Sequence, residues 1–124
     1  MDNSEWVFAR AYVKAREAKD RDLMRRIVAA YVEYMDETVE FFERRSVEVL
    51  GYEPPQIFLV HANSLNFDHF AKIIGMFRSR GYEFVSLEAA LEHKAYRLPD
   101  EYVGEAGISW LHRWGLVKDM EIVS

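Results

Sequence analysis

A histidine stands at the end of the most apolar short run in the chain. The run Ile57–Val60 leads directly into His61, and an Asn-Ser pair follows shortly afterwards. An imidazole group ordinarily titrates near neutral pH, which suits proton transfer. At the end of a buried strand the side chain would be held rigidly, in the place where the loops of an α/β protein converge. We therefore interpret His61 as the candidate proton-transfer residue. The alternative is a strand-end histidine that only bonds to a neighbouring loop.

The other histidines are weaker candidates. His69 and His93 lie in charged helical stretches, so we expect their side chains to be solvated. His112 would share a helical turn with Trp110 and Trp114, a cluster that either packs internally or stacks against a sugar ring, and packing is favoured. The spacing of the histidines matches no compact ligand motif, and the sequence predicts no metal site in this chain.

Composition limits the class of protein. The 124 residues include 50% apolar and 30% charged residues, with a high aromatic share of 15%, which is typical of a folded domain rather than a disordered chain. The formal net charge of -5 argues against a partner bound through its phosphates, so we expect no nucleic acid and no membrane partner. No cysteine is present. The N-terminus lacks the order of a signal peptide, and no window is apolar enough to span a membrane.

The first half of the sequence predicts two helices. Asp2 and Asn3 can cap a helix over about 4–18. Asp20 can cap a long amphipathic helix that ends near Gly51, before the Pro-Pro pair. Its apolar residues recur at intervals of three and four: Met24, Ile27, Val28, Tyr31, Met35, Thr38 and Phe42.

The second half predicts a β-α-β-α unit. The elements are, in chain order, a strand over 57–61, a helix capped by Asn63 or Asn66 that stops at Gly81, a strand over 83–86, a helix opened by Ser86, and a short helix over 109–114. The apolar run before His61 favours a strand buried on both faces, as in a parallel sheet. The predicted fold class is therefore α/β, with a helix-rich N-terminal half followed by the β-α-β-α unit.

Two motifs carry a resemblance to a known family. Ile57-x-Leu59-x-His61 resembles the last catalytic motif of polysaccharide deacetylases of carbohydrate esterase family 4, the NodB-homology domain. The stretches "HANSLNFDHF", "RGYEFVSLEAAL" and "AYRLPDEYVGEAGISWLHRW" extend the similarity, which covers about residues 2–120. The resemblance implies that Leu59 lines the pocket for the acetyl methyl group and that His61 is the general acid.

The N-terminal residues resemble the preceding motif of that family, Asp-x-x-Asp-Trp. Here Asp2 and Trp6 match, and Glu5 replaces the second aspartate. The resemblance implies that Glu5, or Asp2 in its place, orients His61 and that Trp6 forms a wall of the substrate groove. Trp110 is the further candidate for contact with a sugar ring.

The metal-binding motifs of the family have no counterpart here. The sequence contains no Thr-Phe-Asp-Asp segment, no His-x-x-x-His pair and no Arg-Pro motif. The resemblance therefore implies that residues 1–124 form the C-terminal part of a partial (β/α) barrel of the polysaccharide deacetylase type. A divalent, zinc-like metal is expected only with a missing N-terminal portion. Removal of N- or O-acetyl groups from a carbohydrate is the implied reaction, and the chain is expected to be inactive alone.

The incomplete sheet has consequences for assembly. Exposed strand edges favour pairing with another chain, so we expect a homo-oligomer, a swapped arrangement or a complementary N-terminal half. An extracytoplasmic location follows from the resemblance alone. Two alternatives remain: a non-catalytic carbohydrate-binding or assembly module derived from the same fold, and a plain helical scaffold in which Asp2 and His61 are incidental.

Overall fold

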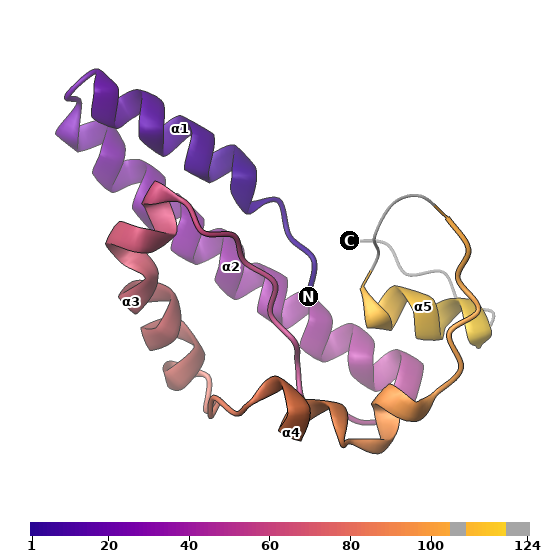
Figure 1. The fold of residues 1–124 in the computed structure, drawn as a ribbon. Helices are drawn as coiled ribbons and strands as arrows, with labels where there is room; N and C mark the ends of the chain where they lie inside the picture. The colour runs from indigo at the N-terminus through magenta and orange to yellow at the C-terminus, as the bar shows by residue number, and fades with distance from the viewer. Residues whose placement is uncertain (105–108, 119–124) are drawn as a thin grey trace. The chain divides into compact units, whose positions relative to one another are not determined.

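The computed structural model describes residues 1–104 and 109–118, and within them every regular element is a helix (Figure 1). The elements are α1 (Glu5–Glu17), α2 (Arg21–Leu50), α3 (Ser64–Ser79), α4 (Leu87–Leu91), the 3-10 helix η1 (Lys94–Arg97) and α5 (Trp110–Val117). The chain forms two compact units. Unit 1 contains Met1–Asp2, Val39–Phe58 and the described residues from Phe84 onward, whereas unit 2 contains Asn3–Thr38 and Leu59–Glu83.

A tight turn joins α1 to α2 in unit 2. Lys19 adopts a left-handed conformation with φ of 57°, and the backbone nitrogen of Asp20 donates to the Ala15 carbonyl at 3.0 Å, which satisfies a carbonyl at the end of α1. The Asp20 carboxylate then accepts from the backbone nitrogen of Leu23 at 3.0 Å. These contacts confirm the predicted end of the first helix and the predicted cap of the second.

Helix α2 buries one stripe along its whole length. Its buried residues are Val28, Tyr31 and Met35 in unit 2, and Val39, Phe42, Ser46 and Val49 in unit 1. The spacing of three and four residues is that of one helix face, and four of the seven residues predicted from the sequence are buried. The helix ends at Leu50, and Gly51 follows with φ of 83°, a conformation that glycine adopts without steric cost.

Helix α3 has the boundaries expected from its caps. Asn63 Oδ1 accepts from the backbone nitrogen of Asn66 at 2.9 Å, so Asn63 is the cap. At the other end Gly81 has φ of 85°, and Tyr82 donates its backbone N–H to the Phe77 carbonyl at 3.1 Å. The rings of Phe77 and Tyr82 lie 5.3 Å apart, edge to face, a hydrophobic contact that commonly accompanies such helix ends.

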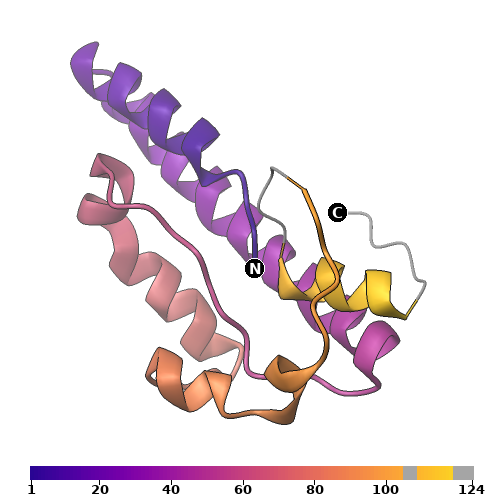
Figure 2. The ribbon, with the colours of Figure 1, turned by 45° about the vertical axis from the view of Figure 1, so that its right-hand side comes forward.

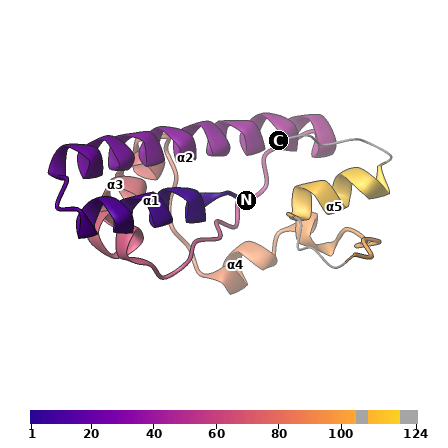
Figure 3. The same cartoon turned by 90° about the horizontal axis from the view of Figure 1, so that it is seen from above.

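Unit 1 contains the short helices α4 and α5 (Figure 3). Each of them begins after a serine whose hydroxyl caps the helix. Ser86 accepts from Ala89, and Ser109 accepts from His112 at 3.2 Å. Trp114 is buried, stacks on the ring of Trp110 and meets the ring of Tyr96 edge to face. Among the helices of the described residues, none has the length and apolar composition needed to cross a membrane.

The predicted α/β class, and with it the partial (β/α) barrel, is wrong. Residues 57–61 and 83–86 form no strand, and the described chain is all-α. Leu59, Phe84 and Val85, expected to be buried in a sheet, are 53%, 52% and 62% exposed. An apolar run rich in β-formers predicts burial only where neighbouring strands pair with it, because strand propensity depends on that context. Figure 2 shows residues 51–63 as a long segment without helix, joining α2 to α3.

Candidate functional site

The chain preceding α1 is bonded to the segment that carries His61. In unit 2, Asn3 Nδ2 donates to the Leu59 carbonyl at 2.9 Å, and two residues later the Glu5 carboxylate accepts from the backbone nitrogen of His61. Both contacts join residues 56 positions apart, so the two segments run in the same direction with a constant offset. The side chains of Asn3 and Glu5 make these hydrogen bonds, whereas two paired strands would be joined by bonds between backbone groups. This alignment brings Glu5 to His61.

The centre of the site is the pair formed by Glu5 and His61. Glu5 Oε1 lies 2.6 Å from His61 Nδ1, and the carboxylate side chain is 2% exposed while the imidazole is 71% exposed. Glu5 is the first residue of α1, where the helix dipole favours negative charge. Because Nδ1 faces the carboxylate, Nδ1 carries the hydrogen. No described residue bonds to Nε2, which is left for another molecule.

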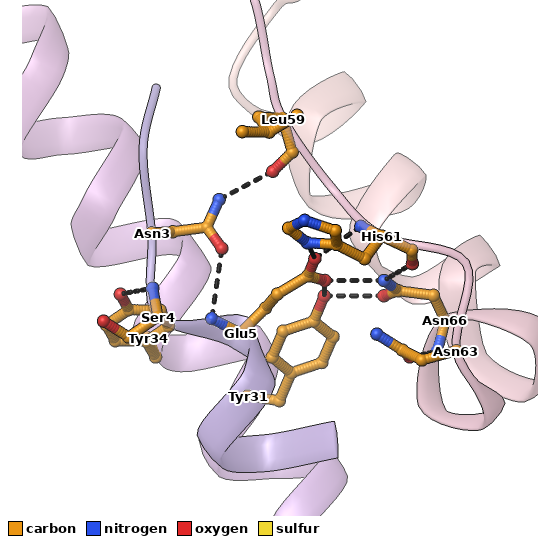
Figure 4. A network of polar contacts seen from close by, with 9 residues as sticks. All are labelled: Asn3, Ser4, Glu5, Tyr31, Tyr34, Leu59, His61, Asn63 and Asn66. Atoms are coloured by element: carbon orange, nitrogen blue, oxygen red, sulfur yellow. Dashed lines mark hydrogen bonds and ion pairs between the residues drawn. The ribbon is translucent and has the colours of Figure 1, made fainter. Parts of the chain in front are cut away.

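Asn66 and Tyr31 complete the bonds around the buried carboxylate (Figure 4). Asn66 Nδ2 donates to Glu5 Oε2 at 2.6 Å and to the His61 carbonyl at 2.8 Å. The Tyr31 hydroxyl donates to Asn66 Oδ1 at 2.6 Å and lies 3.4 Å from Glu5 Oε2. Burial, together with the charge of Glu5, raises the pKa of Tyr31, which keeps its hydroxyl protonated. A buried carboxylate requires such donors, since an unpaired buried charge is costly.

Asn66 and Tyr31 were not predicted as site residues. Asn66 was a candidate helix cap, and Tyr31 belonged to the apolar stripe of the long helix. The signal that could have found them is the presence of hydrogen-bonding groups at positions that the helical pattern buries, since such groups need partners. Which partners they have depends on three helices meeting, and that is a tertiary property.

The remaining candidate residues fall in both units. Trp6 and Leu59 belong to unit 2, like the pair itself, and are 62% and 53% exposed. Asp2 and Trp110 belong to unit 1. Trp110 packs there against the rings of Tyr96 at 6.0 Å and Trp114 at 6.2 Å, and it is 37% exposed. The structure thus joins Glu5 to His61 and places Trp110 in an aromatic cluster.

His112 takes part in packing, as favoured above. Its ring lies 6.3 Å from that of Phe42, and its Nδ1 is 2.5 Å from Ser109 Oγ. Burial lowers the pKa of His112, and the nearby Asp2 carboxylate offsets part of that effect. The expectation of solvated side chains was wrong for both other histidines. His69 is half-buried against Tyr12, and His93 is half-buried as the cap of η1.

The described residues do not fit a metal centre. Nowhere in residues 1–104 and 109–118 do three His, Asp, Glu or Cys side chains come together in a way that could hold a metal ion. The site can therefore offer a positioned imidazole and its carboxylate partner, which is a proton-transfer pair.

No family model, no curated protein and no solved structure matches this chain.

Proposed function

We propose that this chain supplies the general-acid part of a polysaccharide deacetylase-like active site. The observation that carries the proposal is the Glu5–His61 pair, with a 2.6 Å contact, a buried carboxylate and an exposed imidazole. The two residues come from the two motifs that resemble the family. Their contact supports the resemblance, because 55 residues separate them in the sequence.

The chemistry follows from the geometry of the pair. Cleavage of an N-acetyl group requires that the departing amine receive a proton. His61 donates that proton from Nε2 when the ring is charged, and Glu5 stabilises the charged ring through Nδ1–H. Leu59 and Trp6, both exposed in the same unit, are assigned by the resemblance to the acetyl methyl group and the sugar face.

This chain supplies proton transfer alone. In the family that it resembles, a divalent metal activates water and polarises the carbonyl. Since the described residues hold no ligand cluster, we expect the isolated chain to lack deacetylase activity. Purified chain with zinc or cobalt and an N-acetylated oligosaccharide should release no more acetate than the His61→Ala variant. Metal-dependent release above that control would overturn this view.

A second experiment tests the pair directly. In ¹⁵N NMR spectra of the intact chain at neutral pH, His61 should be the tautomer with hydrogen on Nδ1. The Glu5→Gln variant should shift the population toward the Nε2–H tautomer, because an amide is a weaker acceptor than a carboxylate. The Glu88→Gln variant, altered at an exposed glutamate of unit 1, is the control and should change nothing. An unchanged His61 tautomer in Glu5→Gln would contradict the assigned role.

The alternative is a non-catalytic carbohydrate-binding module. The exposure of Trp6, which is 62% exposed, favours it, since exposed aromatic rings stack on sugars. Titration with an N-acetylated oligosaccharide separates the two functions. If both Trp6 and His61 resonances shift, the general-acid proposal is supported. Binding at Trp6 that leaves His61 unaffected supports the module instead.

A further inference from the structure

Unit 2 contains a groove that the Glu5–His61 site does not use. Its volume is about 810 Å³, and α2 and α3 line it. Small-molecule sites in proteins have volumes of roughly 300–1,000 Å³. The groove is thus of the size that takes a small ligand rather than a protein domain.

One wall of the groove is apolar. Met24, Val28 and Val32 lie four residues apart on α2, so their side chains follow one another along the same helix face. Val28 is buried, and the other two are half-exposed. With a rise of 1.5 Å per residue, this wall is about 12 Å long. It matches an extended apolar chain.

The charged residues that line the groove are all cations. Arg21 and Arg25 line the groove from α2, and Lys72 lines it from α3. No acidic side chain is among the lining residues, although the whole chain carries 21 acidic against 16 basic residues. Arg25 pairs with Asp22, but both side chains are more than 70% exposed, and such a pair contributes little. A bound anion could therefore compete for Arg25.

His69 adds a fixed polar group. Its Nε2 lies 3.3 Å from the hydroxyl of Tyr12, and the two rings meet edge to face at 5.6 Å. Tyr12 donates its own hydrogen to Asp68 at 2.5 Å, so its oxygen is left to accept from His69 Nε2–H. His69 is therefore held in place where it lines the groove, three residues from Lys72 on the same face of α3.

We propose that this groove binds a small amphiphilic anion, an acid group on an unbranched apolar chain. The apolar part lies along Met24, Val28 and Val32. The acid group is bound by Arg21, Arg25 and Lys72. The volume favours a small molecule over a partner helix, and the charge of the lining favours an acid over a neutral chain.

The test is a titration of the intact chain with decanoate, followed through the methyl signals of Met24 and Val28. Saturable binding of one decanoate per chain is expected, with decanol binding more weakly because it lacks the charge. Lys72→Glu should weaken decanoate binding by about tenfold, because a charge-assisted contact becomes a repulsion. Lys14→Glu makes the same charge change on an exposed face of α1 outside the groove and should have no effect.

Decyl phosphate provides a further comparison. Saturable binding of either acid supports the proposal, and the tighter one indicates whether a carboxylate or a phosphate head is preferred. His61→Ala should bind decanoate as the parent chain does, so this result is independent of the general-acid proposal. Three outcomes would overturn the groove proposal. They are binding of decanoate that does not saturate, an affinity for decanol equal to that for decanoate, and a loss of decanoate affinity in Lys14→Glu equal to that in Lys72→Glu.

Discussion

At the scale of single residues, the buried carboxylate of Glu5 organises the candidate site. Its two oxygens accept from His61 through Oε1 and from Asn66 through Oε2. The Tyr31 hydroxyl donates to Asn66 Oδ1, which determines that the amide nitrogen of Asn66 faces Glu5. The exposed imidazole is thus the outermost member of a hydrogen-bond network that is otherwise buried.

Removing the two members of the pair should have unequal effects on stability. Glu5→Ala leaves one N–H of the buried Asn66 amide and the backbone N–H of His61 without their acceptor, and should lower the free energy of unfolding by about 3 kcal/mol. His61→Ala removes a mostly exposed ring and should cost less than about 1 kcal/mol. Urea unfolding of both variants checks this. Equal losses of unfolding free energy in the two variants would mean that the buried network around Glu5 does not stabilise unit 2.

Because of Tyr12, the free energy of unfolding should depend on pH in the alkaline range. Burial and the hydrogen bond to Asp68 raise the pKa of Tyr12 to about 12, from an ordinary value near 10. The folded state therefore holds the phenolic proton more tightly than the unfolded state. The resulting stabilisation is complete below pH 10 and is lost as the pH rises from about 10 to 12.

The Tyr12→Phe variant isolates this effect from the other tyrosines. The difference in unfolding free energy between the parent chain and Tyr12→Phe should shrink between pH 9 and pH 12. Urea unfolding at several pH values measures it. A difference that stays constant over this range would show that Tyr12 does not retain its proton in the folded chain.

At the scale of elements, the helices were predictable and the strands were not. The caps Asp20 and Ser86 and the stop signal Gly81 act on the residues next to them, so the sequence alone indicates where those helices begin and end. The segments 57–61 and 83–86 have the composition of strands, but a strand exists only through pairing with another segment. In the described chain, side-chain bonds from Asn3 and Glu5 hold the first of these segments instead.

The turn between α1 and α2 offers a test at this scale. Lys19 has φ of 57°, which costs a residue with a Cβ about 1–2 kcal/mol and costs glycine nothing. The greater flexibility of glycine in the unfolded chain offsets part of this gain. Lys19→Gly should therefore raise the unfolding free energy by about 0.5–1 kcal/mol. Lys14→Gly, inside α1, should lower it by about 1 kcal/mol. Thermal unfolding distinguishes them, and a loss in both would refute the assigned turn geometry.

At the scale of the whole molecule, the chain folds into two compact units. Helix α2 contributes its first half to unit 2 and its second half to unit 1. Unit 2 holds the Glu5–His61 pair and the cationic groove, and unit 1 holds the aromatic cluster around Trp114. The pattern of apolar residues along α2 predicted one continuous stripe and gave no sign that two units share it.

Both units leave large apolar side chains exposed. Phe67 in unit 2 is 91% exposed, and Val85 in unit 1 is 62% exposed. Exposed apolar surface favours association, so we expect self-association. Sedimentation velocity over a concentration series should show the average mass rising with concentration. Phe67→Ser should reduce the rise. A monomer at every concentration would contradict the expectation.

The sequence by itself determined the helices, the long buried stripe of α2 and the candidacy of His61, because propensity, periodicity and capping depend on residues within a few positions of one another. The motif resemblance also named Glu5, or Asp2 in its place, as the partner of His61, and the structure shows the contact with Glu5. Only the tertiary structure decided that Glu5 is buried, that Asn66 and Tyr31 surround it, and that the apolar run before His61 forms no strand and leaves Leu59 53% exposed. These features depend on contacts between residues tens of positions apart, which local sequence patterns do not encode.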